Sequence, residues 1–434
     1  MSRRNREKRA AKLKNRRRAE ASRERVRSGP GPDRVMLLER LVFAFSAAAS
    51  CPDGNTFRRV AAELLDEYQD FASELDTAAD IVVNEAIEAA WRHGWTPSDL
   101  HEVARRRLKA AEVRYLDEAV VLESRRYAAA ALHPQWRAAL ADISTTLGPA
   151  AHTPHMWGWA AANGVGRSDA VNVVLTVLHL LGRLPVLTAL LPLPGTFRQA
   201  PTAVSDIDDK ALGKVRALLA KAEATDFADE AEALSAKAQE LMSRYSLQEA
   251  VAGHDPRHVP LASARRIWID NPYAAAKAVL VQVVGRANRC RAVWAEDIGF
   301  ITVIASETDL RLVELLATSL LVQANRAMLG AGRQITGGEQ ARTRSFRQTF
   351  LVAYAQRIGE RLESVSASVT AEIKHDARLL PVLAANSRAA DELTDRMFPS
   401  TVPRPVAASN GAGWGAGRAA ADMAVLDVRD GIAG

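Results

Sequence analysis

The chain of 434 residues is 48% hydrophobic, 25% charged and 6% aromatic, a composition typical of a helix-prone globular protein with two or three domains. Its two cysteines, Cys51 and Cys290, lie far apart in different candidate domains. This excludes a disulfide framework and fits the reducing cytoplasm, where we expect the protein to be located. The formal net charge of +6 is unevenly placed along the chain.

The positive charge is concentrated in an N-terminal arm, residues 1–32, which we expect to be either helical or disordered. Residues 1–28 hold 13 Lys or Arg and 3 Asp or Glu, a net charge of +10, while the other 406 residues hold 44 and 48, a net charge of −4. Such a segment binds phosphates by counterion release, and because it lacks aromatic residues it cannot stack on bases. We expect either nonspecific DNA or RNA binding or a purely solubilising role. The candidate binding residues are Arg3, Arg4, Arg6, Lys8, Arg9, Lys12, Lys14, Arg16, Arg17 and Arg18.

A membrane location and a secretory signal are not expected. The N-terminus is charged throughout, with no apolar segment after it. The longest apolar stretch, residues 171–191, is interrupted by Asn172, His179, Arg183 and Pro185, whereas a bilayer span needs about 20 apolar residues in succession. The stretch therefore predicts a buried helix followed by a connector.

Apolar periodicity predicts a helical domain over residues 33–145. Near its middle, either Thr96 or Ser98 is expected to cap a helix that runs to about residue 130, with Pro97 in its first turn. A linker with one apolar helix is predicted at 146–205, a helical hairpin at 206–250, an α+β module at 265–370 and a mobile Ala/Gly-rich tail at 371–434. The fold class is therefore mainly α, with a two- or three-stranded sheet in the C-terminal module.

The hairpin is the most informative segment of the chain. Apolar residues at spacings of three and four predict a first helix whose buried stripe runs from Leu212 to Ala222. Thr225 and Asp226 interrupt the pattern and can cap the next turn. The second helix is expected to bury Ala231, Leu234, Ala238, Leu241 and Tyr245, with Leu219, Leu234 and Leu241 packed together. A short connection between two such helices predicts an antiparallel hairpin.

This segment resembles a family of bacteria and their phages, the domain of unknown function 2786. The resemblance implies a helical hairpin and no catalytic residue, since none is assigned in that family. Roles in capping, hairpin pairing and docking to the following module are expected for its polar residues. The matching residues are Lys214, Leu218, Leu219, Ala222, Glu230, Ala231, Glu232, Ala236, Lys237, Ala238, Gln239, Leu241 and Met242.

The region after the hairpin, residues 268–365, is similar to a second family, the domain of unknown function 7168, which commonly follows the first. The similarity rests on Trp268, Cys290, the stretch 299–309 and Ser345-Phe346-Arg347. Here residues 256–266 are expected to form a loop, 289–294 and 299–306 a β-hairpin, and 272–286, 308–329 and 344–369 helices. A short helix is also predicted at about 388–397. Gly411–Gly417 is predicted to be part of the mobile tail or a turn before a short helix.

The chain offers few residues for catalysis, and we expect no catalytic residue, metal site or cofactor. His152 with His155 and His254 with His258 are the only close histidine pairs, and a proline lies inside each of them. In the late helix, Arg344 and Arg347 can bind a phosphate or an acidic partner. Ion pairs between the arginines of this helix and its glutamates are the alternative.

Three functions remain open from the sequence. We favour a noncatalytic protein that is associated with nucleic acid or acts as an adaptor. The first alternative is a phosphate-handling enzyme, in which Asp309 would join Arg344 and Arg347 at one site. We expect no such cluster, because antiparallel helices would separate these residues by roughly 30 Å at 1.5 Å per residue. The second alternative is a scaffold whose hairpin binds a protein partner.

Overall fold

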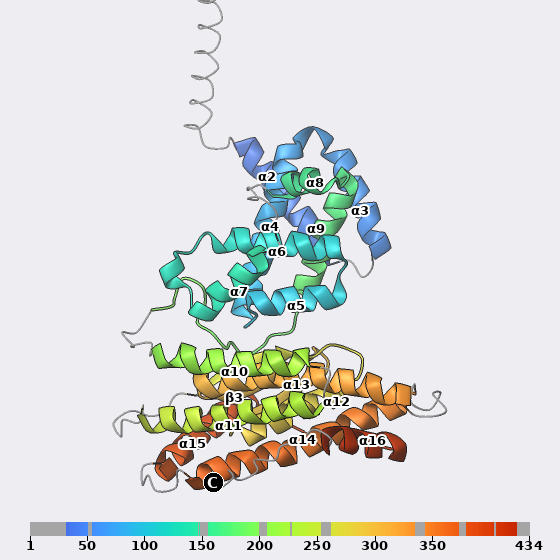
Figure 1. Ribbon diagram of the computed structural model, residues 1–434. Helices are drawn as coiled ribbons and strands as arrows, with labels where there is room; N and C mark the ends of the chain where they lie inside the picture. Colours follow the sequence, from blue (N-terminus) through green and yellow to red (C-terminus); the bar gives the residue numbers. More distant parts are fainter. Residues whose placement is uncertain are drawn as a thin grey trace, which may run out of the picture. The chain divides into compact units, whose positions relative to one another are not determined.

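The computed structural model describes residues 32–50, 54–145, 147, 155–198, 206–225, 228–252, 262–334, 343–372, 379–402 and 405–422. The chain divides into two compact units, residues 1–200 and 201–434. Figure 1 colours the first unit from blue to green and the second from green to red. The described residues are mainly helical, with one three-stranded sheet in the second unit, which confirms the predicted fold class.

The first unit is a body of helices packed around α9 (Arg167–Gly182). This helix contacts α2, α3, α4, α6 and α8, and because it is surrounded its sequence is apolar on almost every side. The one apolar helix predicted within the linker at 146–205 is present as α9, whereas α8 was not predicted, and both helices pack within the helical body. The other helices in the described part of this unit are α2 (Pro32–Ala49), α3 (Gly54–Glu67), α4 (Ala72–Arg92), α5 (Pro97–Arg107), α6 (Ala110–Ser124), α7 (Pro134–Thr145) and α8 (Met156–Asn163), with short 3-10 turns at Gln69–Phe71 and Ala129–Ala131.

The predicted cap at Thr96 is present at the start of α5. The Thr96 hydroxyl accepts a hydrogen bond from the Asp99 amide, and the Asp99 carboxylate accepts one from the Thr96 amide, which makes a capping box with Pro97 in the first turn. The single helix predicted up to residue 130 is wrong. Leu108 has extended backbone angles, so α5 ends at Arg107 and α6 begins at Ala110.

In the second unit, α10 (Asp206–Ala224) and α11 (Ala228–Ala252) pack against each other as an antiparallel hairpin (Figure 1). Glu230 closes the connection, because its carboxylate accepts a hydrogen bond from Thr225 (2.8 Å) and pairs with Lys221 (3.0 Å). Both contacts lower the pKa of Glu230, and the hydrogen bond from Thr225 has the larger effect.

The predicted buried face of α11 is rotated in the structure. Leu234 and Leu241 are only partly buried, whereas Ala238 and Met242 lie at 0% exposure. The predicted joint burial of Leu219, Leu234 and Leu241 is thus wrong for its last two members. The rotation occurs because polar residues share the buried stripe, which consists of Ser235, Ala236, Ala238, Gln239, Met242, Ser243, Ser246 and Leu247.

The sheet has the order β1-β3-β2, with β3 (Phe300–Ala305) antiparallel to both neighbours. The β2 (Arg291–Ala295) and β3 hairpin agrees with the prediction. β1 (Ser263–Trp268) contradicts the predicted loop at 256–266. Arg265 and Arg266 interrupt the apolar alternation by which a strand is recognised in the sequence. In the structure, Arg265 is held at the sheet edge by ion pairs to Glu307 and Glu314.

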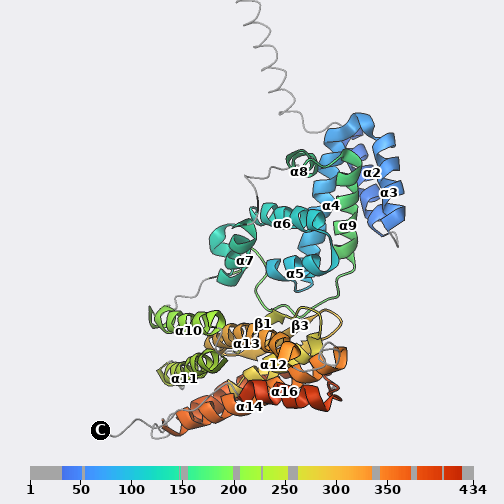
Figure 2. The same ribbon diagram turned by 45° about the vertical axis from the view of Figure 1, so that its right-hand side comes forward.

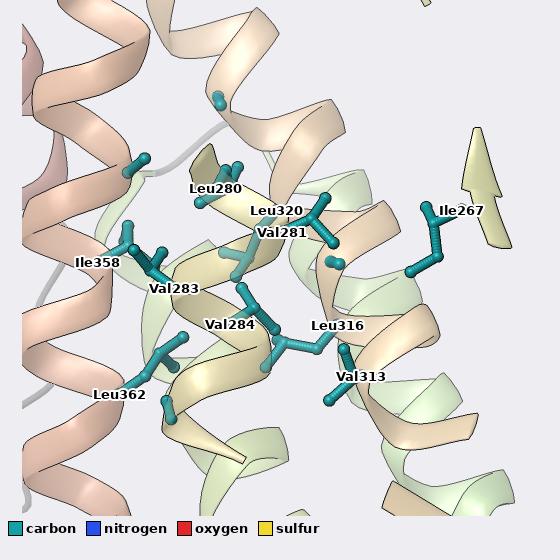
Figure 3. Close-up of a cluster of buried hydrophobic side chains, with 14 of the residues drawn as sticks. Ile267, Leu280, Val281, Val283, Val284, Val313, Leu316, Leu320, Ile358 and Leu362 are labelled. Carbon is teal, nitrogen blue, oxygen red and sulfur yellow. The ribbon is translucent and has the colours of Figure 1, made fainter. Parts of the chain in front are cut away.

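The core of this unit lies around α12 (Ala274–Ala287), between α13 (Glu307–Gln334) and α14 (Arg344–Glu372). Figure 3 shows Val283 directed toward Ile358 of α14, and Val284 toward Leu316 of α13. By length and composition α13 is apolar enough to cross a membrane over Glu307–Ala331, with a mean hydropathy of 1.2. Many of its apolar residues, among them Leu316 and Leu320, pack into this core, while Val322 and Leu329 are exposed.

The tail predicted to be mobile contains two packed helices, α15 (Leu379–Met397), which includes the short helix predicted at about 388–397, and α16 (Gly411–Asp422). α15 packs against β3, β2 and α11, and α16 lies along α14 (Figure 2). The glycines of this stretch allow α16 to pack closely against the backbone of α14. A Cβ atom on Gly413 would lie 2.6 Å from the carbonyl oxygen of Phe346, and one on Gly417 would overlap the carbonyl oxygen of Phe350.

We predict that Gly417→Ala loosens α16 from α14 and lowers the free energy of unfolding by roughly 1–3 kcal/mol, because the added methyl group meets backbone that cannot move aside. Gly415→Ala is the matched control, since its Cβ would meet nothing within 4 Å and alanine favours a helix by up to about 1 kcal/mol. Thermal unfolding and limited proteolysis of residues 405–422 measure both changes. Equal protease resistance in the two variants would contradict the packing argument.

Candidate functional site

The polar residues of α11 lie where the hairpin docks on the rest of the second unit. Gln239, Ser243 and Ser246 recur at spacings of four and three, which puts them on one face of the helix. That face meets the end of α12, the first turn of α13 and the late part of α14. The residues form two adjacent groups with different chemistry.

The first group is a buried cluster of amides and hydroxyls. The Gln239 amide donates to Asn288 Oδ1 at 3.0 Å, and the Asn288 amide donates back to Gln239 Oε1 at 3.2 Å. Gln239 Nε2 also lies 3.1 Å from Ser243 Oγ and 2.9 Å from Ser366 Oγ, and the two hydroxyls are 3.2 Å apart. Gln239 is 0% exposed. Because every polar side chain here has a partner, the cluster fixes how α11 sits on α12 and α14.

The second group joins a carboxylate, a hydroxyl and a guanidinium. Ser246 Oγ donates to Asp309 Oδ1 at 2.5 Å and accepts from Arg289 Nη2 at 2.7 Å. Arg289 Nη2 also lies 3.7 Å from Asp309 Oδ1. The other carboxylate oxygen of Asp309 accepts from Ser306, which caps α13. Asp309 therefore holds a helix start and a docking helix together.

Cys290 lies beside the second group without forming a reactive centre. Its side chain is buried at 4% exposure, and the thiol lies 3.3 Å from the backbone oxygen of Asn288. Burial, followed by the Asp309 charge, raises the pKa of this thiol well above its ordinary value. A neutral thiol is a weak nucleophile, so this arrangement does not activate Cys290 for covalent chemistry.

Most of the matched family positions whose side chains are described pack in the core or pair with a neighbouring residue. Leu219, Ala222, Ala236, Ala238 and Met242 are buried, while Leu218 and Leu241 pack partly exposed against the same core. Lys237 pairs with Glu240 at the surface (2.7 Å), Lys214 is exposed, and the side chain of Glu232 lies outside the described part. Among the polar family positions whose side chains are described, Gln239 is the one that is fully buried.

The phosphate-site residues are far apart. Asp309 contacts Ser246, one turn along α11 from Ser243, which in turn contacts Ser366 of α14. Arg344 opens α14, and from there to Ser366 the helix rises by roughly 33 Å at about 1.5 Å per residue. Arg344 and Arg347 are thus at the opposite end of α14 from Asp309. Later arginines of α14 anchor α16, since Arg357 pairs with Asp422.

Of the two close histidine pairs, His155 alone lies in the described part of the chain. The basic arm, His152, His254 and His258 lie outside the described residues. His155 is buried, stacks on Tyr115 and contacts Glu118 through Nε2 at 3.1 Å. Among the described residues, no group of three or more His, Cys, Asp or Glu side chains is placed to hold a metal ion.

The helical hairpin that carries the docking residues of α11 matches a known sequence family. Residues 210–249 match the family described as "Protein of unknown function (DUF2786)". The match spans most of α10 and α11 and includes all three docking residues of α11. The comparisons with curated proteins and with solved structures gave no match.

Sequence reasoning found Gln239 but missed Ser243, Ser246, Asn288 and Ser366. The signal for the two serines was available, because they continue the helical spacing from Gln239. Asn288 and Ser366 come from segments 49 and 127 residues away from Gln239. A single sequence gives no indication of contacts at such separations, so these two residues could only be found in the fold.

We predict that Gln239→Leu lowers the free energy of unfolding by about 1–3 kcal/mol, because the buried side chains of Asn288, Ser243 and Ser366 each lose their hydrogen bond to Gln239. Gln248→Leu on the same helix is the control: Gln248 is exposed, so its replacement should change stability by less than about 0.5 kcal/mol. Urea unfolding followed by circular dichroism gives both values. Similar losses in the two variants would contradict a specific docking role.

Proposed function

We propose that this protein is a noncatalytic, nucleic-acid-associated adaptor that acts in the cytoplasm. Its basic arm binds the phosphate backbone of DNA or RNA without reading sequence, and the folded units provide the adaptor body. The observation that carries the proposal is the partition of charge, a net of +10 in residues 1–28 against −4 in the other 406 residues. A near-neutral body leaves the arm as the dominant source of attraction for a polyanion.

The contacts of the folded part support a noncatalytic reading of the family segment. Gln239, Ser243 and Ser246 are each bonded within the second unit, so their polar atoms hold the hairpin on the module. Asp309 has the same kind of role and lies far from Arg344. We also propose that residues 268–365 correspond to the domain of unknown function 7168, with the hairpin and this module forming one functional body.

We predict that deleting residues 1–28 abolishes most salt-sensitive binding to a nonspecific DNA duplex while leaving the unfolding temperature nearly unchanged. The affinity of the whole chain should fall with salt concentration on a log–log plot with a slope of about −0.9 for each phosphate contacted. Fluorescence anisotropy over a salt series measures this slope. In the deleted chain the slope should approach zero.

Two further variants test whether binding depends on the charge of the arm, as opposed to its length or to arginines of the folded body. A full-length chain in which Arg3, Arg4, Arg6, Lys8 and Arg9 become Gln should show a reduced slope although its length is unchanged. The double variant Arg344→Gln, Arg347→Gln should bind like the original protein. If instead the deleted chain binds as tightly as the full chain, the nucleic-acid site is not in the arm and the proposal fails.

A further inference from the structure

A cavity of about 390 Å³ lies in the first unit, at the corner between α5 and α6. Its volume is within the range of small-molecule sites, roughly 300–1,000 Å³. Charged groups line one part of it and apolar side chains the rest. The lining residues that matter here are His101, Arg105, Leu108, Val113, Arg114 and Asp117.

The break between the two helices creates this cavity. Leu108 takes extended backbone angles, which ends α5 and turns the chain into α6 at Ala110. The last turn of α5 and the first two turns of α6 therefore face the same space. Lys109 precedes α6 and makes no side-chain cap at its start.

A histidine–aspartate pair forms one wall of the cavity. His101 Nδ1 lies 3.0 Å from both carboxylate oxygens of Asp117, and the Asp117 side chain is only 6% exposed while that of His101 is 31% exposed. The hydrogen bond to Asp117 raises the pKa of His101. Because Nδ1 is occupied by Asp117, Nε2 is the ring nitrogen left to donate to a ligand.

Two arginines place further positive charge at the cavity. Arg114 reaches from α6 and is held by a hydrogen bond from Nη1 to Asn163 Oδ1 at 2.7 Å. Arg105 reaches from α5, where Glu102 orients it at 3.0 Å. With His101 protonated, the lining carries three cationic groups and the Asp117 carboxylate, and Arg105 is paired with Glu102, which does not line the cavity. Leu108, Val113 and Leu147 supply the apolar wall.

We propose that this cavity binds a small organic anion, with its carboxylate or phosphate group between His101, Arg105 and Arg114 and its apolar part against Leu108 and Val113. Guanidinium groups and an imidazolium N–H are donors suited to both kinds of anionic group. The site is independent of the basic arm, since all its residues lie in α5, in α6, at Leu108 between them and at Leu147.

The test is isothermal titration calorimetry of the full-length protein with phenyl phosphate, benzoate and the neutral control benzyl alcohol. Arg114→Gln and Arg105→Gln, on different helices, should each weaken binding of the preferred anion by about tenfold or more. Arg107→Gln is the matched control, because Arg107 is an exposed arginine in the same last turn of α5 and does not line the cavity. Circular dichroism verifies that each variant is folded.

The outcomes distinguish a built site from general attraction to positive charge. The basic arm is identical in all these proteins, so a difference between Arg114→Gln and Arg107→Gln belongs to the cavity. Tighter binding of phenyl phosphate than of benzoate assigns a phosphate ligand, and the reverse assigns a carboxylate. If neither anion binds, if Arg107→Gln weakens binding as much as the cavity variants, or if benzyl alcohol binds equally well, the proposal is overturned.

Discussion

The close approach of neighbouring helices to α14 at glycine residues is the constraint on which the second unit depends. A Cβ atom on Gly359 of α14 would lie 2.8 Å from Val283 of α12, and glycines of α16 press against α14 from another direction. At such separations side chains interdigitate at the density of a crystal, and one added methyl group must displace neighbouring atoms. The fully buried Phe346 and Phe350 of α14 are packed within this arrangement.

The hairpin is attached to that packed body by a different kind of interaction. Apolar burial alone tolerates small rotations of a helix, whereas the Gln239–Asn288 amide pair is satisfied in one orientation only. Ser246 and Asp309 add a second fixed point about two turns further along α11. Together these contacts specify the rotation of α11, which explains why its buried stripe differs from the one that apolar spacing predicts.

Local features of the fold could be predicted from the sequence, and features that depend on distant partners could not. The Thr96 cap and the hairpin follow from residues within a few positions of each other. The Gly-rich helix α16 has the composition of a flexible tail, and only the surface of α14 makes it a packed element. Likewise, His101 and Asp117 are 16 residues apart across a helix break, so no helical spacing connects them.

The position of α16 has a consequence for how the second unit is completed during synthesis. Residues 411–422 cover a face of α14 that is made some 60 residues earlier, as the contact between Arg357 and Asp422 shows. Until residues 411–422 leave the ribosome, this face of α14 lacks its partner and is exposed apolar surface. A chain that stops before Gly411 therefore keeps that surface exposed, which marks it for chaperones and proteases as unfinished.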